Sequence, residues 1–120
     1  MKKLWSILIL FGSVLLLAGC SSSPKYSNLD EFAQCLTDAG VKFYGTTTCQ
    51  YCLQQKESFG TSFSKINFTD CTKNPIQCDL AKVSKIPHWS ISSSVSLNGF
   101  QELETLSKET WCELIANTSS

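Results

Sequence analysis

The sequence contains no arginine, so its positive charge comes from ten lysines alone. Arginine is the preferred bidentate ligand of phosphate, and nucleic-acid-binding domains carry basic stripes. Ten acidic residues balance the ten lysines, and the formal net charge is zero. The composition therefore argues against a nucleic-acid partner.

Histidine is almost absent too, because His88 is the only one in the chain. A zinc site needs a second pair of ligands beside a CxxC pair such as Cys49 and Cys52. Cys71 and Cys78 are seven residues apart, which is not the spacing of such a pair. The sequence predicts no metal site and no bound cofactor.

The chain also lacks an apolar run long enough for a permanent membrane span. Residues 4–18 are mostly apolar and follow two lysines. About 15 residues rise roughly 22 Å as a helix, less than the ~30 Å hydrocarbon core. The segment is typical of a cleaved signal peptide.

The end of this run, Leu17-Ala18-Gly19-Cys20, resembles the lipobox of bacterial lipoproteins. The resemblance implies cleavage before Cys20 and a lipid on its sulfur. It predicts an extracytoplasmic protein anchored by lipid to the inner or the outer membrane. An ordinary signal peptide or a short membrane anchor, with an incidental cysteine, is the alternative.

The chain accordingly divides into three parts. Residues 1–19 are the predicted signal peptide, and residues 20–28 are the lipidated cysteine with a polar, flexible tether. Residues 29–120 form one small domain with a modest core, a size at which covalent staples are useful. Without the signal peptide, eight lysines and ten acidic residues give a formal charge of −2.

Hydrophobic periodicity predicts the first half of the domain. Apolar residues at i, i+3, i+4 and i+7 from Leu29 predict a helix between a possible N-cap, Asn28, and Gly40. A strand is predicted at residues 41–44, a helix from Cys49 to Gly60, and a strand at residues 66–69.

The second half adds a helix, two strands and a closing helix. Asn74-Pro75 begins a helix with Ile76, Leu80 and Val83 on one face. Two strands at residues 88–92 and 95–97 are joined by serines, and apolar positions between residues 100 and 115 favour a helix.

This order predicts an α/β fold, a small mixed four-stranded sheet with helices on both faces. The strand–helix–strand crossover makes the first two strands parallel, and the last two are antiparallel. Trp89 and Trp111, with several phenylalanines, are expected to fill the core.

The chemical signature is Cys49-Gln50-Tyr51-Cys52, where a predicted strand ends and a helix begins. Free N–H groups and the helix dipole stabilise a thiolate at that position, and Cys52 follows one turn later. A lowered thiol pKa makes Cys49 a better leaving group, and so makes the disulfide more oxidising. A structural Cys49–Cys52 bridge is the alternative, although so small a loop removes little chain entropy.

The strand, the CxxC at a helix start, and Ile86-Pro87 before the third strand resemble the thioredoxin superfamily. The segments LDEFAQCLTDAGVKFYGTTTCQYC, INFTDC, IPHW and GFQELETLS resemble, more closely, the thioredoxin-like domain associated with bacterial vitamin K epoxide reductase homologues. The resemblance implies a thioredoxin-like fold, a cis Ile86–Pro87 bond beside the redox pair, and backbone hydrogen bonds from Ile86 to substrate.

The sequence departs from the family pattern at several positions. Thr48 replaces the usual tryptophan, Gln50-Tyr51 replaces a frequent Pro-His, and Phe43 stands where thioredoxin keeps a buried carboxylate. These departures leave the reduction potential open. His88 follows the proline, where an exposed loop histidine is a commoner outcome than one beside the redox pair.

An export signal would place the remaining cysteines where disulfides persist. Related domains often carry a pair in the loop that contains Cys71 and Cys78, so a disulfide is expected, either as a staple or as a second redox couple. Its eight-residue loop contributes about 2.5 kcal/mol. Cys35 is either a buried inert thiol or the partner of Cys112.

The resemblance thus implies a membrane-tethered thiol–disulfide oxidoreductase acting on exported thiol or disulfide proteins. Cys49 would form the mixed disulfide, Cys52 would resolve it, and a quinone-linked membrane oxidase of the vitamin K epoxide reductase type would re-oxidise the pair. A reductive direction remains open. The alternative class is a non-catalytic thioredoxin-like lipoprotein that binds a partner or copper.

Overall fold

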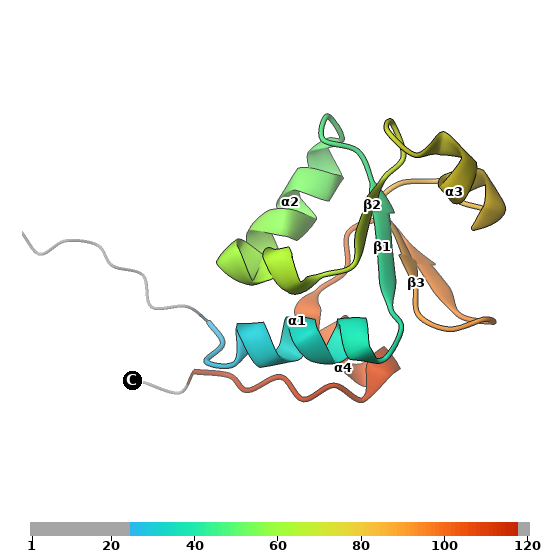
Figure 1. Ribbon diagram of the computed structural model, residues 1–120. Coiled ribbons are helices and arrows are strands. Elements are labelled where there is room, and N and C mark those ends of the chain that lie inside the picture. Colours follow the sequence, from blue (N-terminus) through green and yellow to red (C-terminus); the bar gives the residue numbers. More distant parts are fainter. Residues whose placement is uncertain (1–24, 118–120) are drawn as a thin grey trace, which may run out of the picture.

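Four short strands form the centre of the computed structural model, which describes residues 25–117 (Figure 1). They are β1 (Lys42–Gly45), β2 (Phe68–Asp70), β3 (His88–Ser90) and β4 (Ser96–Asn98), in the spatial order β2-β1-β3-β4. β1 and β2 are parallel, whereas β3 is antiparallel to both β1 and β4. The predicted mixed four-stranded sheet is confirmed.

Four α-helices surround the sheet: α1 (Leu29–Asp38), α2 (Gln50–Phe59), α3 (Pro75–Leu80) and α4 (Leu103–Thr110). Residues of α1, α2 and α4 join the core on the sheet face that carries Phe43 and Trp89. α3 lies over the opposite face, near Tyr44 and Thr69. Helices therefore cover both faces, which makes the architecture compatible with a thioredoxin-like fold.

The core is rich in aromatic rings. The centroids of Phe43 and Trp89, which are register partners on β1 and β3, lie 4.6 Å apart. Phe32 of α1 and Phe59 of α2 stack beside them with centroids 6.0 Å apart. Burying each such ring contributes about 1.5–3 kcal/mol, so the core fixes both α1 and α2 against β1.

The boundary between α2 and β2 differs from the prediction. The chain continues from α2 into a 3₁₀ helix, η1 (Gly60–Lys65), and Ile66 is its C-cap. Ile66 therefore does not begin the strand, and β2 starts at Phe68.

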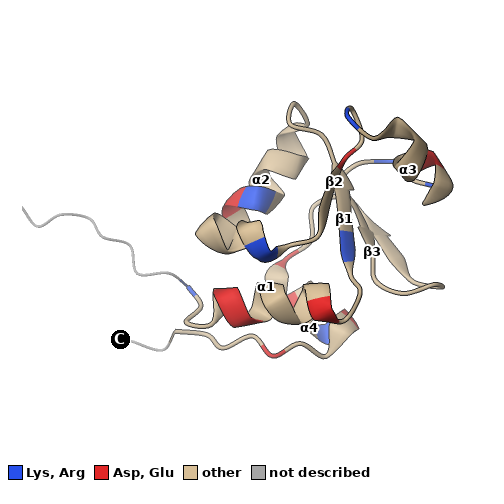
Figure 2. Ribbon diagram, in the orientation of Figure 1, with Lys and Arg blue, Asp and Glu red and all other residues tan. Residues whose placement is uncertain are grey.

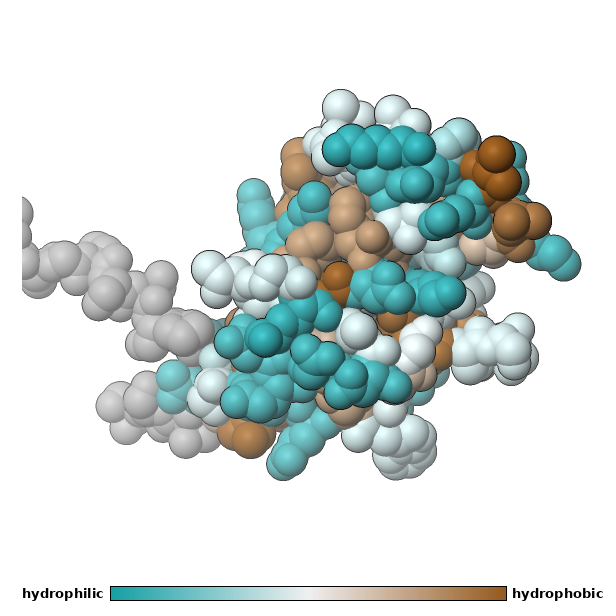
Figure 3. All heavy atoms as spheres, in the orientation of Figure 1, coloured by the Kyte–Doolittle hydropathy of each residue, from teal (hydrophilic) through white to brown (hydrophobic). Residues whose placement is uncertain are grey.

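α3 is shorter than predicted and does not bury its apolar face. The helix ends at Leu80, and Lys82 turns the chain with a positive φ of 57°. Ile76 and Leu80 are 72% and 79% exposed. They form part of the apolar surface visible over α3 in Figure 3.

The closing helix is also shorter than predicted, and Trp111 is not a core residue. α4 ends at Thr110, and Trp111 takes a left-handed conformation with φ of 62°. Its side chain is 93% exposed. The helix stops because Cys112 is bonded to Cys35 of α1, and because the Ser107 hydroxyl donates to the Cys112 carbonyl.

The folded part begins before α1, inside the predicted tether. Tyr26 is buried and forms a β-bridge with Ala116, and the Ser27 amide donates to the Ile115 carbonyl. Asn28 occupies the N-cap position of α1 without capping it. Its side chain bonds to the Glu113 carbonyl and the Ile115 amide instead.

Acidic and basic residues are both distributed along the ribbon of the domain (Figure 2). Within residues 25–117, none of the helices combines the length and the hydrophobicity needed to traverse a bilayer. The predicted signal peptide and Cys20 lie outside the described residues.

Candidate active site

Cys49 and Cys52 lie at the start of α2, as the sequence predicts. β1 ends at Gly45, a short loop follows, and Cys49 is the N-cap residue of the helix. The Cys52 amide donates to the Cys49 sulfur at 3.2 Å. The sulfur therefore takes the place of a capping oxygen and satisfies one of the free N–H groups of the first turn.

The two thiols differ in their surroundings. Both are free, but Cys49 is partly exposed whereas Cys52 is fully buried. Burial, followed by the hydrogen bond with Cys49, raises the pKa of Cys52 to about 12. The Thr46 backbone and the charge of Lys56 act in the opposite direction on that pKa. Cys49 is thus the accessible thiol, and Cys52 is a protected one.

Gly45 makes room for the buried sulfur. A Cβ atom at this position would lie 2.7 Å from Cys52 Sγ and 3.3 Å from Cys52 Cβ. Any side chain would push α2 away from the end of β1. No sequence pattern predicts this contact, because only the packing of α2 against the end of β1 brings Gly45 and Cys52 together.

The Ile86–Pro87 bond is cis, which confirms the prediction. The antiparallel register pairs Phe43 with Trp89 and Tyr44 with His88, so its next step places Pro87 opposite Gly45. Adjacent strands are about 5 Å apart, and Gly45 touches Cys52 Sγ. The proline is therefore next to the redox pair.

Ile86, the residue before the cis-proline, has free backbone groups. Its side chain is 37% exposed, and within residues 25–117 neither its N–H nor its carbonyl has a hydrogen-bond partner. Such groups are suited to pairing with an extended polypeptide. The role of Ile86 in substrate binding stays a prediction.

A buried glutamine of α2, Gln55, connects this helix to β3 and to the segment before α4, and the sequence analysis did not identify it. Gln55 is fully buried; its Oε1 accepts from Trp89 Nε1 at 3.1 Å and from the Gln101 amide at 2.8 Å. Its Nε2 donates to the Gln101 carbonyl at 3.0 Å. Gln55 follows Cys52 by three residues, a helical spacing that could have placed it on the buried face.

The other four cysteines of residues 25–117 form two disulfides. Cys71–Cys78 is bonded as expected, and the Cys71 amide donates to the Gly45 carbonyl at 2.8 Å. Cys35 is bonded to Cys112, so it is not an inert thiol. The redox pair is thus the one set of free thiols among residues 25–117.

His88 is neither in an exposed loop nor directed at α2. It is a buried residue of β3, with Nδ1 2.8 Å from Asn98 Oδ1 and its ring against Tyr44. The prediction of an exposed histidine is wrong because β3 begins immediately after Pro87, and β4 covers the ring. It occupies the sheet face opposite Phe43 and Trp89.

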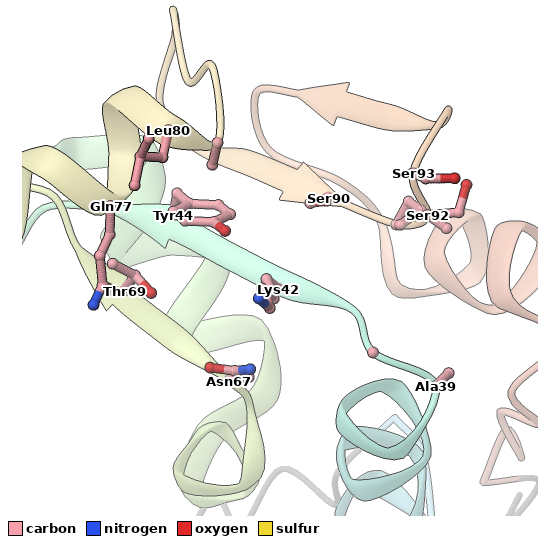
Figure 4. Close-up of a pocket in the computed structure, with 13 residues that line it drawn as sticks. Ala39, Lys42, Tyr44, Asn67, Thr69, Gln77, Leu80, Ser90, Ser92 and Ser93 are labelled. Atoms are coloured by element: carbon pink, nitrogen blue, oxygen red, sulfur yellow. The ribbon is translucent and has the colours of Figure 1, made fainter.

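A cavity lies on that second face, and neither Cys49 nor Cys52 lines it. It has a volume of about 720 Å³ and is lined by β1, β2, α3 and the β3–β4 loop, with Lys42 and Tyr44 in its floor (Figure 4). Within the described part of the chain, no cluster of three His, Cys, Asp or Glu side chains is arranged to hold a metal ion.

Comparison with known proteins points to the same chemistry as the site. No protein-family model matches the chain. The chain is similar to a thiol-disulfide oxidoreductase. This relative is LTO1 of Arabidopsis thaliana, with 36% identity over 99 residues. The similarity supports a general redox role for this protein.

The extent of the match limits what can be carried over. It includes 75% of this chain but only 25% of the relative. The chain thus spans about a quarter of the length of that protein. The activity of full-length LTO1 is a property of that relative, and the match covers only a quarter of it.

Proposed function

We propose that the protein is an extracytoplasmic, membrane-tethered thiol–disulfide oxidoreductase that exchanges disulfides with exported proteins. The observation that carries the proposal is the asymmetry of the pair. Cys49 is partly exposed at the N-cap of α2, and Cys52 is buried one turn behind it. One sulfur can meet a substrate while the other is kept for the intramolecular step.

In the oxidative direction, a substrate thiolate attacks Cys49 Sγ of the Cys49–Cys52 disulfide. The S–S bond breaks, Cys52 leaves as a thiolate and is then protonated, and a mixed disulfide joins Cys49 to the substrate. A second substrate thiolate attacks the substrate sulfur of that bond and releases Cys49. The substrate loses two electrons and two protons, and the pair gains them.

Substrate segments would bind beside Ile86, whose free backbone groups can form hydrogen bonds with an extended polypeptide. The tether is the predicted lipid on Cys20, and the proposed re-oxidant is a quinone-linked membrane oxidase of the vitamin K epoxide reductase type. Both rest on the sequence resemblance. The pair itself works in either direction, and the available oxidant or reductant selects one.

Trapping a mixed disulfide tests the exchange chemistry. Cys52→Ser leaves Cys49 without its resolving thiol, so incubation with a disulfide-containing peptide should yield a stable adduct on Cys49. Cys49→Ser is the matched control and should give none, because Cys52 is buried. Mass spectrometry of tryptic peptides locates the adduct. Adducts on neither variant, or equally on both, would reject the proposal and leave a binding lipoprotein as the better description.

A further inference from the structure

Lys56 occupies an unusual position for a lysine. It lies one turn after Cys52 on α2 and is partly buried. Its Nζ is 4.6 Å from the ring centroid of Phe68 and 5.2 Å from that of Phe63. Cation–π contacts of this kind hold an ammonium group in a fixed place instead of leaving it in solvent.

A short series of contacts links this ammonium group to the buried sulfur. The Phe68 ring packs against Phe43, with centroids 5.6 Å apart. The Phe43 ring approaches to 3.7 Å of the Cβ position of Gly45, and that position is 2.7 Å from Cys52 Sγ. Cys52 and Lys56 are four residues apart on α2, and both therefore face the β1–β2 pair.

Two titratable side chains among residues 25–117 influence the pKa of Cys52 through their charge: Cys49 raises it and Lys56 lowers it. From the strands, β1 contributes Phe43, β3 contributes Trp89, and Asp70 of β2 accepts from the Thr72 amide instead. Positive charge favours the thiolate over the thiol, and it matters most where water is excluded.

We propose that Lys56 is the positive charge that stabilises the Cys52 thiolate whenever that thiolate forms during exchange. This inference rests on the proposed exchange chemistry and adds a residue to it. In the resolving step, Cys52 loses a proton to solvent and attacks Cys49 Sγ. The Cys49–Cys52 bond forms, and the substrate thiolate leaves. In the reverse direction Cys52 is the leaving thiolate, so the same charge assists both.

The test oxidises the reduced protein with an aromatic disulfide, 5,5′-dithiobis(2-nitrobenzoate), and measures the rates of two successive thiolate releases. Cys49 attacks the reagent and releases the first coloured thiolate. Cys52 then attacks Cys49 Sγ and releases the second. In a double-mixing stopped-flow experiment, the mixed disulfide is formed at pH 4, where the attack by Cys52 is slow. A second mixing step then raises the pH to 7, so that the rate of the second release is measured alone.

Lys56→Met keeps the aliphatic stem on the two rings and removes the charge, whereas Lys56→Arg retains it. The second release should slow about threefold in Lys56→Met, with the first release unchanged, and Lys56→Arg should restore the rate. Lys108→Met, at an exposed lysine of α4, is the matched control and should behave as wild type.

Each result decides the question. An unchanged second release in Lys56→Met would overturn the inference. So would an equal slowing of both releases, or a Lys56→Arg rate as low as that of Lys56→Met, since each indicates packing and not charge. If the wild type releases fewer than two thiolates per molecule, the exchange chemistry itself fails, which is a separate outcome.

Discussion

At the residue scale, the site depends on the different surroundings of Cys49 and Cys52, two thiols that lie one helical turn apart. Cys49 caps α2 with its sulfur and remains accessible, whereas Cys52 points into the core against Gly45. The pKa of Cys52 lies at about 12 because burial disfavours the charged form. Below that pH Cys52 is a neutral thiol, so it must lose its proton before it can attack Cys49 Sγ.

Alkylation should reveal this asymmetry directly. Treating the reduced protein with iodoacetamide between pH 6.5 and 9 should modify Cys49 long before Cys52. The raised pKa of Cys52 keeps it protonated throughout that interval, and burial excludes the reagent. Peptide mass spectrometry over time gives both rates. Comparable rates for the two thiols would show that the attacking and resolving roles are assigned wrongly.

Gly45 offers a second test at this scale. Gly45→Ala should destabilise the fold by about 1–3 kcal/mol, because the new methyl group meets the sulfur of a fixed helix. Adding Cys52→Ala removes that sulfur and should recover much of the loss. Urea unfolding of the two single variants and the double variant gives the coupling energy. Additive effects would mean that α2 moves aside at no cost.

At the element scale, short apolar segments between turn residues predicted the strands of the sheet, although β1 is buried on both faces and shows no alternation of buried and exposed residues. β4 ends at Asn98, and α4 lies within the segment of residues 100–115 whose apolar positions favoured a helix. The ends of α3 and α4 were mispredicted. Helical periodicity continued past both, but a left-handed Lys82 and a disulfide at Cys112 stop the helices. Neither feature has a local sequence signal.

The pairing of the cysteines was also only partly predictable from the sequence. Cys71 and Cys78 are close in sequence, so their bond could be anticipated, whereas Cys35 and Cys112 are 77 residues apart and only the fold brings them together. Gln55 was missed for a related reason: a polar residue on a helix is read as exposed until its partners, here Trp89 and Gln101, are placed.

The two disulfides should contribute unequally to stability. Chain entropy predicts about 4.5 kcal/mol for a loop as long as that of Cys35–Cys112 and about 2.5 kcal/mol for the Cys71–Cys78 loop. Replacing each pair by two alanines and measuring urea unfolding gives the comparison. A greater loss from the Cys71–Cys78 replacement would show that local packing around α3 outweighs chain entropy.

At the scale of the whole molecule, the two ends of the described chain are joined beside α4. Lys25 forms a 2.9 Å ion pair with Glu104, and the Tyr26 hydroxyl donates to the same carboxylate. The hydrogen bond from Tyr26, followed by that from Lys25, lowers the pKa of Glu104 to about 2. The segment that leads toward the predicted lipid is thus attached to the body of the domain.

This attachment should weaken in acid. A carboxylate whose pKa is lowered by folding stabilises the folded state above its ordinary pKa of about 4.3, and the contribution disappears as pH falls toward 2. Amide exchange at Ser27, corrected for intrinsic rates, should therefore be less protected at pH 2.5 than at pH 6. Glu104→Gln is the control and should show no such change. Equal protection in the wild type at both values would contradict the linkage.

The central claim is that Cys49 and Cys52 form a reversible redox couple, distinct from the two structural bridges. The direct measurement is the reduction potential of the pair, obtained by equilibration in glutathione or dithiothreitol buffers followed by thiol alkylation and mass spectrometry. We expect a two-electron transition between about −270 and −120 mV, the interval occupied by thiol–disulfide exchange proteins, with Cys35–Cys112 and Cys71–Cys78 still oxidised. A Cys49–Cys52 bond that resists reduction below about −300 mV, as structural disulfides do, would contradict the account.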